Sequence, residues 1–196
     1  MSSLSRTPAS DFSPLLDRLG QELATCRRDE SWLTLVGIRV LDRLGEAADS
    51  VRARSALALH HGRMAGVLKR SVRFRSRTGR DADAFMPLGE VYYIVFPGTS
   101  EELVQVPIQR ILQRWHGAAE ELAIRERLAL ERLLAVGVAS WHPSRREVQP
   151  QDLLAFCTMM IDQASHEDGV ADHLVPEGEG SGQVHTTLRL ASFRWL

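Results

Sequence analysis

Apolar segments of strand length alternate along this chain with segments of helical periodicity. The strand-length segments are 32–41, 92–96 and 133–141, each rich in β-branched or aromatic residues. In three other segments, 50–72, 99–122 and 150–169, apolar residues recur three and four positions apart. This alternation predicts an α/β chain, a sandwich of helices and a sheet in which mixed strand directions are possible.

The first half of the chain carries signals for helix starts and for a buried strand. A helix is expected at 14–28, with Pro14 in its first turn and Ser13 as its N-cap. Segment 32–41 follows as a buried central strand. Thr99 or Ser100 is the expected cap before 101–122, where Pro107 predicts a kink or a break.

The chain is expected to divide into three parts. Residues 1–30 form a flexible N-terminus and a lead helix, and residues 31–175 form the main domain. Residues 176–182, PEGEGSG, predict a flexible linker. Apolar residues alternate in 183–196, which predicts an extra C-terminal strand that joins a sheet edge.

Charge and cysteine content exclude several classes of protein. The formal net charge of −1 gives no general attraction to nucleic acid or to anionic lipid. Residues 69–80 are basic, but they contain no DNA-binding motif and predict a loop. Cys26 and Cys157 stand in apolar stretches without metal-ligand spacing, which predicts buried free thiols and no bound metal or cofactor. With no apolar run of about 18 residues and no apolar leader, a cytoplasmic protein is expected.

The stretch PLGEVYYIVFPGT, residues 87–99, raises the question of chemistry. Gly89 and Glu90 stand at a turn before the apolar strand 92–96, and Pro97-Gly98 closes that strand. A carboxylate beside a glycine at the tip of a hairpin is a place where a metal ion or a phosphate can bind.

Four segments in sequence order resemble the GGDEF domain, the diguanylate cyclase fold of bacterial cyclic di-GMP signalling. LTLVGIRVLDRLG (33–45) resembles the first strand of that family, and PLGEVYYIVFPGT resembles its signature hairpin. LLAVGVASW (133–141) resembles a late strand, and QDLLAFCTMMIDQASHEDG (151–169) resembles the closing helix. The resemblance covers about residues 31–172. It implies a nucleotidyl-cyclase-like palm fold for 31–175, an α+β sandwich in which helices flank a central, mostly antiparallel sheet.

The residues that the family uses to hold metal are altered in this chain. The family's cyclases place one carboxylate on the first strand and one in the signature turn, because Mg²⁺ prefers hard oxygen ligands. The first-strand position falls on Gly37, which has no ligating side chain, and Arg39 follows two residues later. The five signature positions fall on a sequence that retains one acidic residue: Leu88, Gly89, Glu90, Val91 and Tyr92. The resemblance implies no metal site, and Glu90 is expected to be a solvated turn carboxylate.

The residues that read guanine and hold phosphate are altered as well. The family's guanine-reading asparagine and aspartate fall near Gly45 and Arg54, and the lysine of its closing helix falls on Ser165. Because all of these groups are replaced together, we expect a degenerate GGDEF domain that is not an enzyme.

A regulatory ligand site is implied by the same resemblance. Many members of the family bind cyclic di-GMP through an Arg-x-x-Asp motif before the signature, helped by an arginine on the following helix. Arg80 and Asp83 match this motif with an offset of one residue, and Arg110 and Arg114 lie on the following predicted helix. Arginine binds phosphate and the guanine edge through two parallel hydrogen bonds, so these four residues are the expected ligand site. A surface ion pair in an arginine-rich segment is the alternative.

Three functions therefore remain open from the sequence. The first is a non-catalytic effector that binds cyclic di-GMP and regulates an unidentified protein partner. The second is a protein-interaction module that binds no nucleotide. The third is a residual diguanylate cyclase that uses Glu90. The sequence leaves open whether the chain forms a homodimer.

Overall fold

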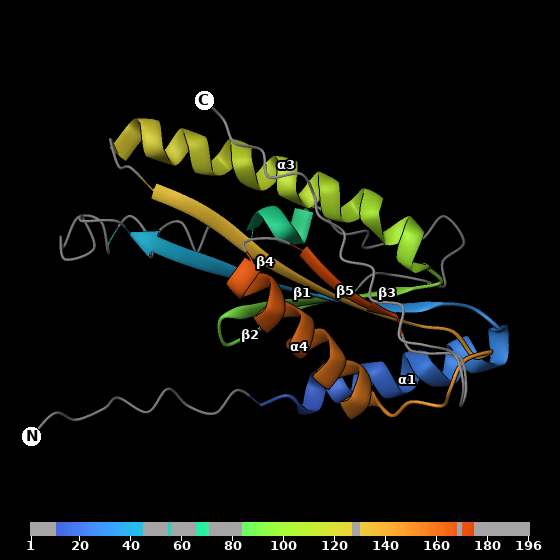
Figure 1. The fold of residues 1–196 in the computed structure, drawn as a ribbon. Coiled ribbons are helices and arrows are strands. Elements are labelled where there is room, and N and C mark those ends of the chain that lie inside the picture. Colours follow the sequence, from blue (N-terminus) through green and yellow to red (C-terminus); the bar gives the residue numbers. More distant parts are fainter. Residues whose placement is uncertain are drawn as a thin grey trace, which may run out of the picture.

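A computed structural model describes residues 11–44, 55, 66–70, 84–126, 130–167 and 170–174. Five strands form one sheet in the order β2-β3-β1-β4-β5 (Figure 1). The neighbours β2-β3, β3-β1 and β1-β4 are antiparallel, and β5 runs parallel to β4. The prediction of a mostly antiparallel sheet flanked by helices is confirmed.

The helices and strands follow the predicted alternation. In chain order they are α1 (Ser13–Asp29), β1 (Leu33–Leu44), β2 (Ala84–Leu88), β3 (Val91–Pro97), α3 (Glu101–Glu126), β4 (Leu130–Trp141), α4 (Pro150–Glu167) and β5 (Val170–Leu174). Residues 66–70 are also helical. Strand β1 lies between β3 and β4, so the predicted buried central strand is correct.

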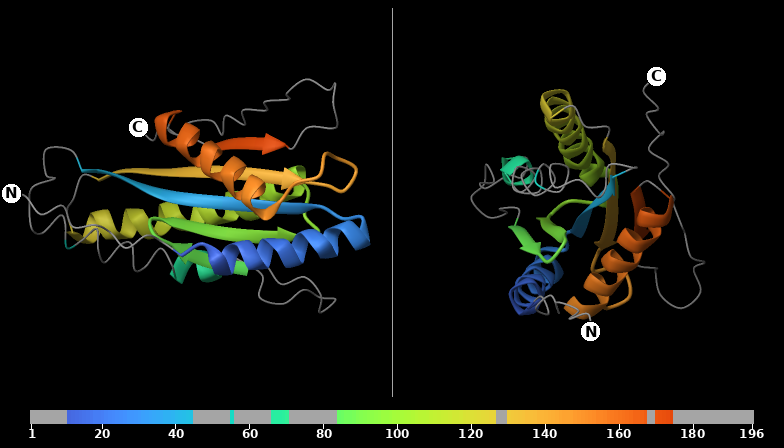
Figure 2. Two further views of the ribbon diagram at one scale, coloured as in Figure 1. Left: turned by 90° about the horizontal axis from the view of Figure 1, so that it is seen from below. Right: turned by 90° about the vertical axis from the view of Figure 1, so that its left-hand side faces the viewer.

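The strands carry apolar side chains on both faces because helices cover both. Leu33 and Leu35 of β1 belong to a core cluster with α1 and α4 on one face of the sheet. Val36 and Ile38, which alternate with them, belong to a second cluster with α3 and residues 66–70 on the other face. Figures 1 and 2 show α3 on one side of the sheet and α4 on the other. We call these two sides the α4 face and the α3 face.

Helix α1 begins differently from the prediction. The N-cap position is Phe12, and no side chain of that residue caps the helix. The backbone N–H of Ser13 instead donates to Oδ1 of Asp11 at 2.9 Å, so Ser13 lies within the helix and is not its cap. This hydrogen bond lowers the pKa of the exposed Asp11 carboxyl. Pro14 lies in the first turn as predicted.

Helix α3 begins as predicted but is not broken. Oγ of Ser100 accepts from the backbone N–H of Leu103 at 3.4 Å, so Ser100 acts as the cap. Pro107 lies inside a helix that continues from Glu101 to Glu126, so Pro107 does not break the helix. An internal proline costs about 3 kcal/mol, which is offset here by apolar side chains buried against the sheet, among them Val104 and Ile108.

Two short edge strands were not predicted. Strand β2 contains Pro87, which has no N–H for a neighbouring strand, and proline is tolerated in a sheet mainly at edges. Strand β5 has five residues of mixed polarity and lies at the opposite edge. The strand expected at 183–196 lies outside the described residues, as does most of the helix expected at 50–72. Within the described part of the chain, no helix is long and apolar enough to span a membrane.

Candidate functional site

The positions that resemble the metal and phosphate site lie together on the α4 face. Gly37 pairs with Tyr93 of β3, and Arg39 pairs with Val91, the residue that follows the β2–β3 turn. On the other side of β1, Gly37 pairs with Gly137 of β4. Helix α4 packs across these strands, as its contacts with β1 and β4 show (Figure 1). The first strand, the signature turn and the closing helix therefore meet, as the resemblance implies.

The glycine pair brings α4 unusually close to the sheet. A Cβ atom added at Gly37 would lie 2.3 Å from Cδ1 of Ile161 and 3.1 Å from Sγ of Cys157. A Cβ atom added at Gly137 would lie 2.5 Å from the backbone oxygen of Cys157 and from the backbone nitrogen of Ile161. Both positions need glycine because α4 occupies the space that a side chain would fill. A carboxylate at Gly37 would overlap the Ile161 side chain in this arrangement.

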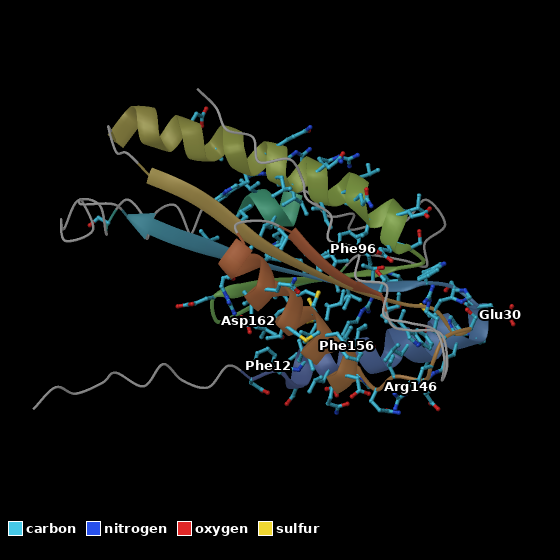
Figure 3. All side chains as sticks on the ribbon, in the orientation of Figure 1. Phe12, Glu30, Phe96, Arg146, Phe156 and Asp162 are labelled. Atoms are coloured by element: carbon cyan, nitrogen blue, oxygen red, sulfur yellow. The ribbon has the colours of Figure 1, made fainter. Side chains whose placement is uncertain are left out.

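Arg39 forms an ion pair with α4. Its Nη1 donates to Oδ1 of Asp162 at 2.8 Å and lies 3.4 Å from Oγ of Ser165. The Arg39 side chain is 26% exposed and that of Asp162 is 56% exposed. Figure 3 labels Asp162 at the end of α4 that is distant from Glu30 and Arg146. The position of the family's phosphate-binding lysine, Ser165, thus lies beside a guanidinium supplied by β1.

The β2–β3 turn is a tight hairpin whose only acidic group is exposed. Leu88 pairs with Val91, which leaves Gly89 and Glu90 as a two-residue turn. Gly89 has φ of 59°, a conformation that favours glycine. Glu90 is exposed, whereas Val91 is buried and Leu88 packs partly against the core of the α4 face. The signature positions on either side of the turn therefore serve packing.

Tyr93 places a hydroxyl between β3 and α4. Its hydroxyl lies 3.4 Å from Oγ1 of Thr158, which also donates to the carbonyl of Leu154 at 2.9 Å. Burial raises the pKa of Tyr93 above its ordinary value. Burial also raises the pKa of Cys157, whose Sγ lies 3.5 Å from the carbonyl oxygen of Gly137. Both groups stay protonated at neutral pH, so neither supplies a negative ligand.

The donor set therefore does not fit a divalent metal ion. Gly37 offers no oxygen ligand from a side chain, and the Arg39 guanidinium carries a positive charge at the same end of the site. Among the described residues, no group of three or more His, Cys, Asp or Glu side chains could hold a metal ion. Gly45 and Arg54, the expected guanine-reading positions, lie outside the described residues.

The four residues of the expected cyclic di-GMP site are only partly described. Arg80 and Asp83 lie outside the described residues, and Asp83 is bonded to Ala84, the first residue of β2. Arg110 and Arg114 are exposed on α3, one helical turn apart. Nη1 of Arg114 donates to the carbonyl of Arg70 at 2.9 Å, which ties α3 to the helical residues 66–70. Arg110 has no side-chain partner within the described part of the chain.

Two residues of the site were missed at the sequence level. Asp162 and Thr158 lie on the predicted helix 150–169, where nothing in the local sequence separates them from ordinary polar surface residues. Their partners, Arg39 and Tyr93, are 123 and 65 residues away. Only the closing of α4 over β1 and β3 brings these pairs together.

Solved structures with the same fold include GGDEF domains of bacterial proteins. The GGDEF domain of YfiN (TpbB) from Pseudomonas aeruginosa is 17% identical, with a TM-score of 0.55 over 84% of this chain and 94% of that one. The GGDEF domain of DgcB from Caulobacter crescentus, in complex with c-di-GMP, is 12% identical, with a TM-score of 0.56 over 88% of this chain and 98% of that one.

A third similar structure contains a protein partner. It is the diguanylate cyclase SiaD from Pseudomonas aeruginosa in complex with its activator SiaC, 16% identical, with a TM-score of 0.53 over 84% of this chain and 59% of that one. No protein-family model and no curated protein matches the sequence. The identities are too low to transfer activity, but the expected fold is confirmed: this chain has the fold of the GGDEF domains of diguanylate cyclases.

Proposed function

We propose that this chain is a catalytically inactive GGDEF-like signalling protein that binds cyclic di-GMP and, through it, regulates a protein partner. The proposal that the chain is catalytically inactive rests on the close contact between Gly37 and α4. A Cβ atom there would overlap Ile161, so the position lacks both the carboxylate and the space for one. Arg39 adds a cation where cyclase chemistry needs a divalent ion.

The proposed ligand site combines Arg80 and Asp83, which precede β2 in the sequence, with Arg110 of α3. Arg110 supports this role because it is exposed and has no partner within the described residues. An arginine of this kind can bind a phosphate or a guanine edge through its planar donors without first breaking an ion pair. Arg114 supports the site indirectly, because its hydrogen bond to the Arg70 carbonyl holds residues 66–70 against α3.

Two similar structures support the choice of ligand and of partner class. The DgcB domain was solved in complex with c-di-GMP, and SiaD was solved with an activator protein. The fold thus accommodates both kinds of interaction in other chains. For this chain, the proposal is that the binding site for cyclic di-GMP is retained although the catalytic residues are replaced.

The test is a calorimetric titration of the full chain with cyclic di-GMP. Wild type should bind, Arg80→Ala and Arg110→Ala should weaken binding by at least about tenfold each, and Arg114→Ala should weaken it less. Arg28→Ala is the matched control, because Arg28 is exposed near the end of α1 and, among the described residues, pairs with its neighbour Asp29. Absence of any binding heat for the wild type would reject the ligand and leave a nucleotide-independent interaction module.

A second measurement tests the lack of catalysis. The full chain is incubated with GTP and Mg²⁺, and the products are separated by chromatography. No cyclic di-GMP should form. Product that disappears in a Glu90→Gln variant would identify a residual cyclase and contradict the proposal.

A further inference from the structure

The sheet ends in two edge strands, and one of them is closed to further pairing. Strand β2 is joined to β3 by the two-residue turn Gly89-Glu90, in which Gly89 has φ of 59°. Such a turn makes its flanking residues a hydrogen-bonded pair, and hydrogen-bonded pairs alternate along an antiparallel ladder. Leu88 and every second residue before it therefore direct their backbone groups at β3, whereas Pro87 directs its backbone outward. Because proline has no N–H, the middle of this outer edge cannot donate to a further strand.

Strand β5, at the opposite edge, is open. Among the described strands it is the last on its side, and it contains no proline. The chain leaves β5 at Leu174, and the connector 175–182 leads to the apolar alternation that begins at residue 183. A neighbouring antiparallel strand lies about 4.8 Å away, so this connector is long enough to close a hairpin with β5.

The same connector reaches the β2 edge only if it is almost fully extended. A strand beyond β2 would lie five inter-strand spacings from β5, about 24 Å in a straight line through the sheet. The residues 175–182, fully extended, span at most about 26–29 Å. Helices cover both faces of the sheet and lengthen any path around it (Figure 2). Chain length and backbone chemistry therefore both select β5 as the neighbour of the segment.

The alternation in 183–190 fits the α4 face of the sheet. Position 173 of β5 pairs with Ala139 of β4, which belongs to the core cluster of that face, so positions 171 and 173 lie on the α4 face. If 175–182 forms the whole loop, Gln183 pairs with Leu174, and position 184 lies opposite position 173. Every second residue from 184 onward then lies on the α4 face, and the residues between them, which are polar, lie on the other. The residues on the α4 face are Val184, Thr186, Leu188 and Leu190.

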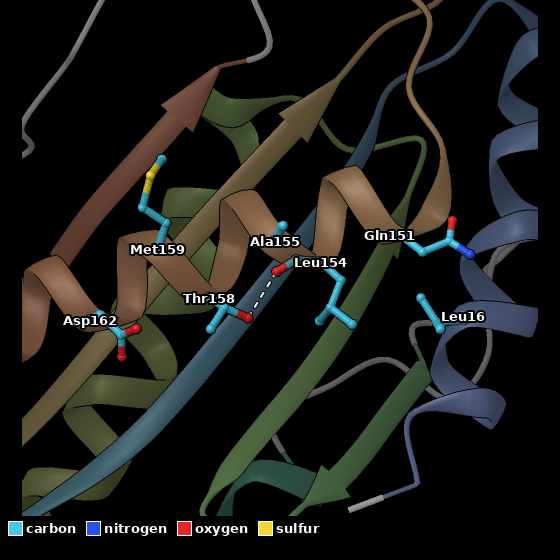
Figure 4. A pocket seen from close by; sticks show the side chains of 7 residues that line it. All are labelled: Leu16, Gln151, Leu154, Ala155, Thr158, Met159 and Asp162. Carbon is cyan, nitrogen blue, oxygen red and sulfur yellow. Dashed lines mark hydrogen bonds between the residues drawn. The ribbon is translucent and has the colours of Figure 1, made fainter.

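Helix α4 presents apolar side chains where these residues would lie. Met159 is 47% exposed, although α4 packs against β5. Figure 4 shows its side chain on the side of α4 where β5 lies, away from Thr158, which contacts Tyr93 of β3. Phe156, three residues earlier, is half-buried against the core of the α4 face. An added strand with apolar residues on this face would bury apolar surface of α4 that is now open to water.

We propose that residues 183–190 form a sixth strand that pairs antiparallel with β5 and places Val184, Thr186 and Leu188 against α4. The strand occupies the open edge of the sheet and covers Met159. Because the segment is tethered to β5 through the connector 175–182, the pairing is intramolecular and does not depend on protein concentration. A strand from another molecule can pair with β5 only after this segment is displaced.

The experiment is hydrogen exchange of the full chain, followed by mass spectrometry at several protein concentrations. Amides of 183–190 should exchange at least about tenfold more slowly than in an isolated peptide of the same sequence, at every concentration. Leu188→Asp should remove this protection because it places a charge against α4. Thr187→Asp, the matched control on the other face of the strand, should retain it. An unprotected wild type, equal losses in both variants, or protection that appears only at high concentration would overturn the proposal.

Thiol labelling tests the proposed face of the sheet. Met159→Cys places a thiol on the β5 side of α4, and wild type, whose Cys26 and Cys157 are buried, gives the background. The new thiol should react at least about tenfold faster when Leu188→Asp is added, because that change removes the covering strand. Adding Thr187→Asp should leave the rate unchanged, and circular dichroism should show that all variants remain folded. A labelling rate that does not respond to Leu188→Asp would refute the proposed position of the strand.

Discussion

Replacing Gly37 or Gly137 by alanine should have different effects on stability, because the two glycines contact different parts of α4. At Gly37 the nearest atom to a new Cβ is the end of a side chain, Cδ1 of Ile161 at 2.3 Å. At Gly137 the nearest atoms belong to the backbone of α4, at 2.5 Å. A side-chain end can rotate away or be removed, but the helix backbone can yield only if α4 moves.

The expected losses of stability follow from these contacts. Overpacking a core costs about 1–3 kcal/mol, and replacing a strand glycine by alanine recovers about 0.5–1 kcal/mol. Gly37→Ala should therefore lower the free energy of unfolding by about 1–2 kcal/mol, and Gly137→Ala by about 3 kcal/mol or more, because there the helix itself must shift.

A double-mutant cycle with Ile161→Val tests whether the end of the Ile161 side chain causes the overlap at Gly37. This change removes Cδ1 and by itself costs about 0.5–1.5 kcal/mol. Combined with Gly37→Ala it should restore about 1 kcal/mol relative to additivity, because the overlap disappears. With Gly137→Ala it should restore much less. The free energies come from urea unfolding followed by tryptophan fluorescence; equal rescue at both glycines, or a Gly37→Ala variant more stable than wild type, would refute the reasoning.

Three further predictions concern buried polar groups. Oγ1 of Thr34 donates to the Thr99 carbonyl at 2.7 Å and lies 2.8 Å from Oγ of Ser140. Thr34→Val should therefore cost about 1–3 kcal/mol in urea unfolding by leaving these groups unsatisfied, and an unchanged midpoint would contradict this. The two buried thiols should resist a thiol reagent in the native protein and react fully in denaturant; fast native reaction would show that they are accessible. Burial raises the pKa of Tyr93, so the unfolded chain loses this proton first, and stability should fall as pH rises above about 10. Tyr93→Phe should flatten that part of a pH–stability profile, and an unchanged slope would exclude Tyr93 as the cause.

The longer elements could be predicted from the sequence because their patterns are local. Strands β1, β3 and β4 and helices α1 and α4 each contain enough apolar residues at regular spacing to identify them. Strands β2 and β5 have five residues each and lie at sheet edges, where a proline or polar residues are tolerated. Their pairing depends on neighbours distant in the chain, so no local pattern indicates it.

The candidate site, too, could be predicted from the sequence only in part. That Gly37 lacks a ligating side chain is evident from the sequence, but the reason for glycine there is not. The reason is Ile161, more than a hundred residues later, which packs onto the strand. Likewise, Arg39 could be identified as a cation near the signature turn, whereas its partner Asp162 is found only when α4 is in place.

The close approach of α4 links the stability of the fold to the glycines at positions 37 and 137. The two glycines let the α4 backbone settle onto β1 and β4, and the Arg39–Asp162 pair holds the far end of the helix. A carboxylate restored at Gly37 alone would overlap Ile161 and would have to be buried beside Cys157, so it would destabilise the core before it could bind a cation. A carboxylate at this position therefore requires the Ile161 side chain to move away or to be shortened. The proposed dinucleotide site, which combines Arg80 and Asp83 with Arg110 of α3, does not depend on that space. Binding at that site is therefore compatible with the close packing of α4 onto Gly37.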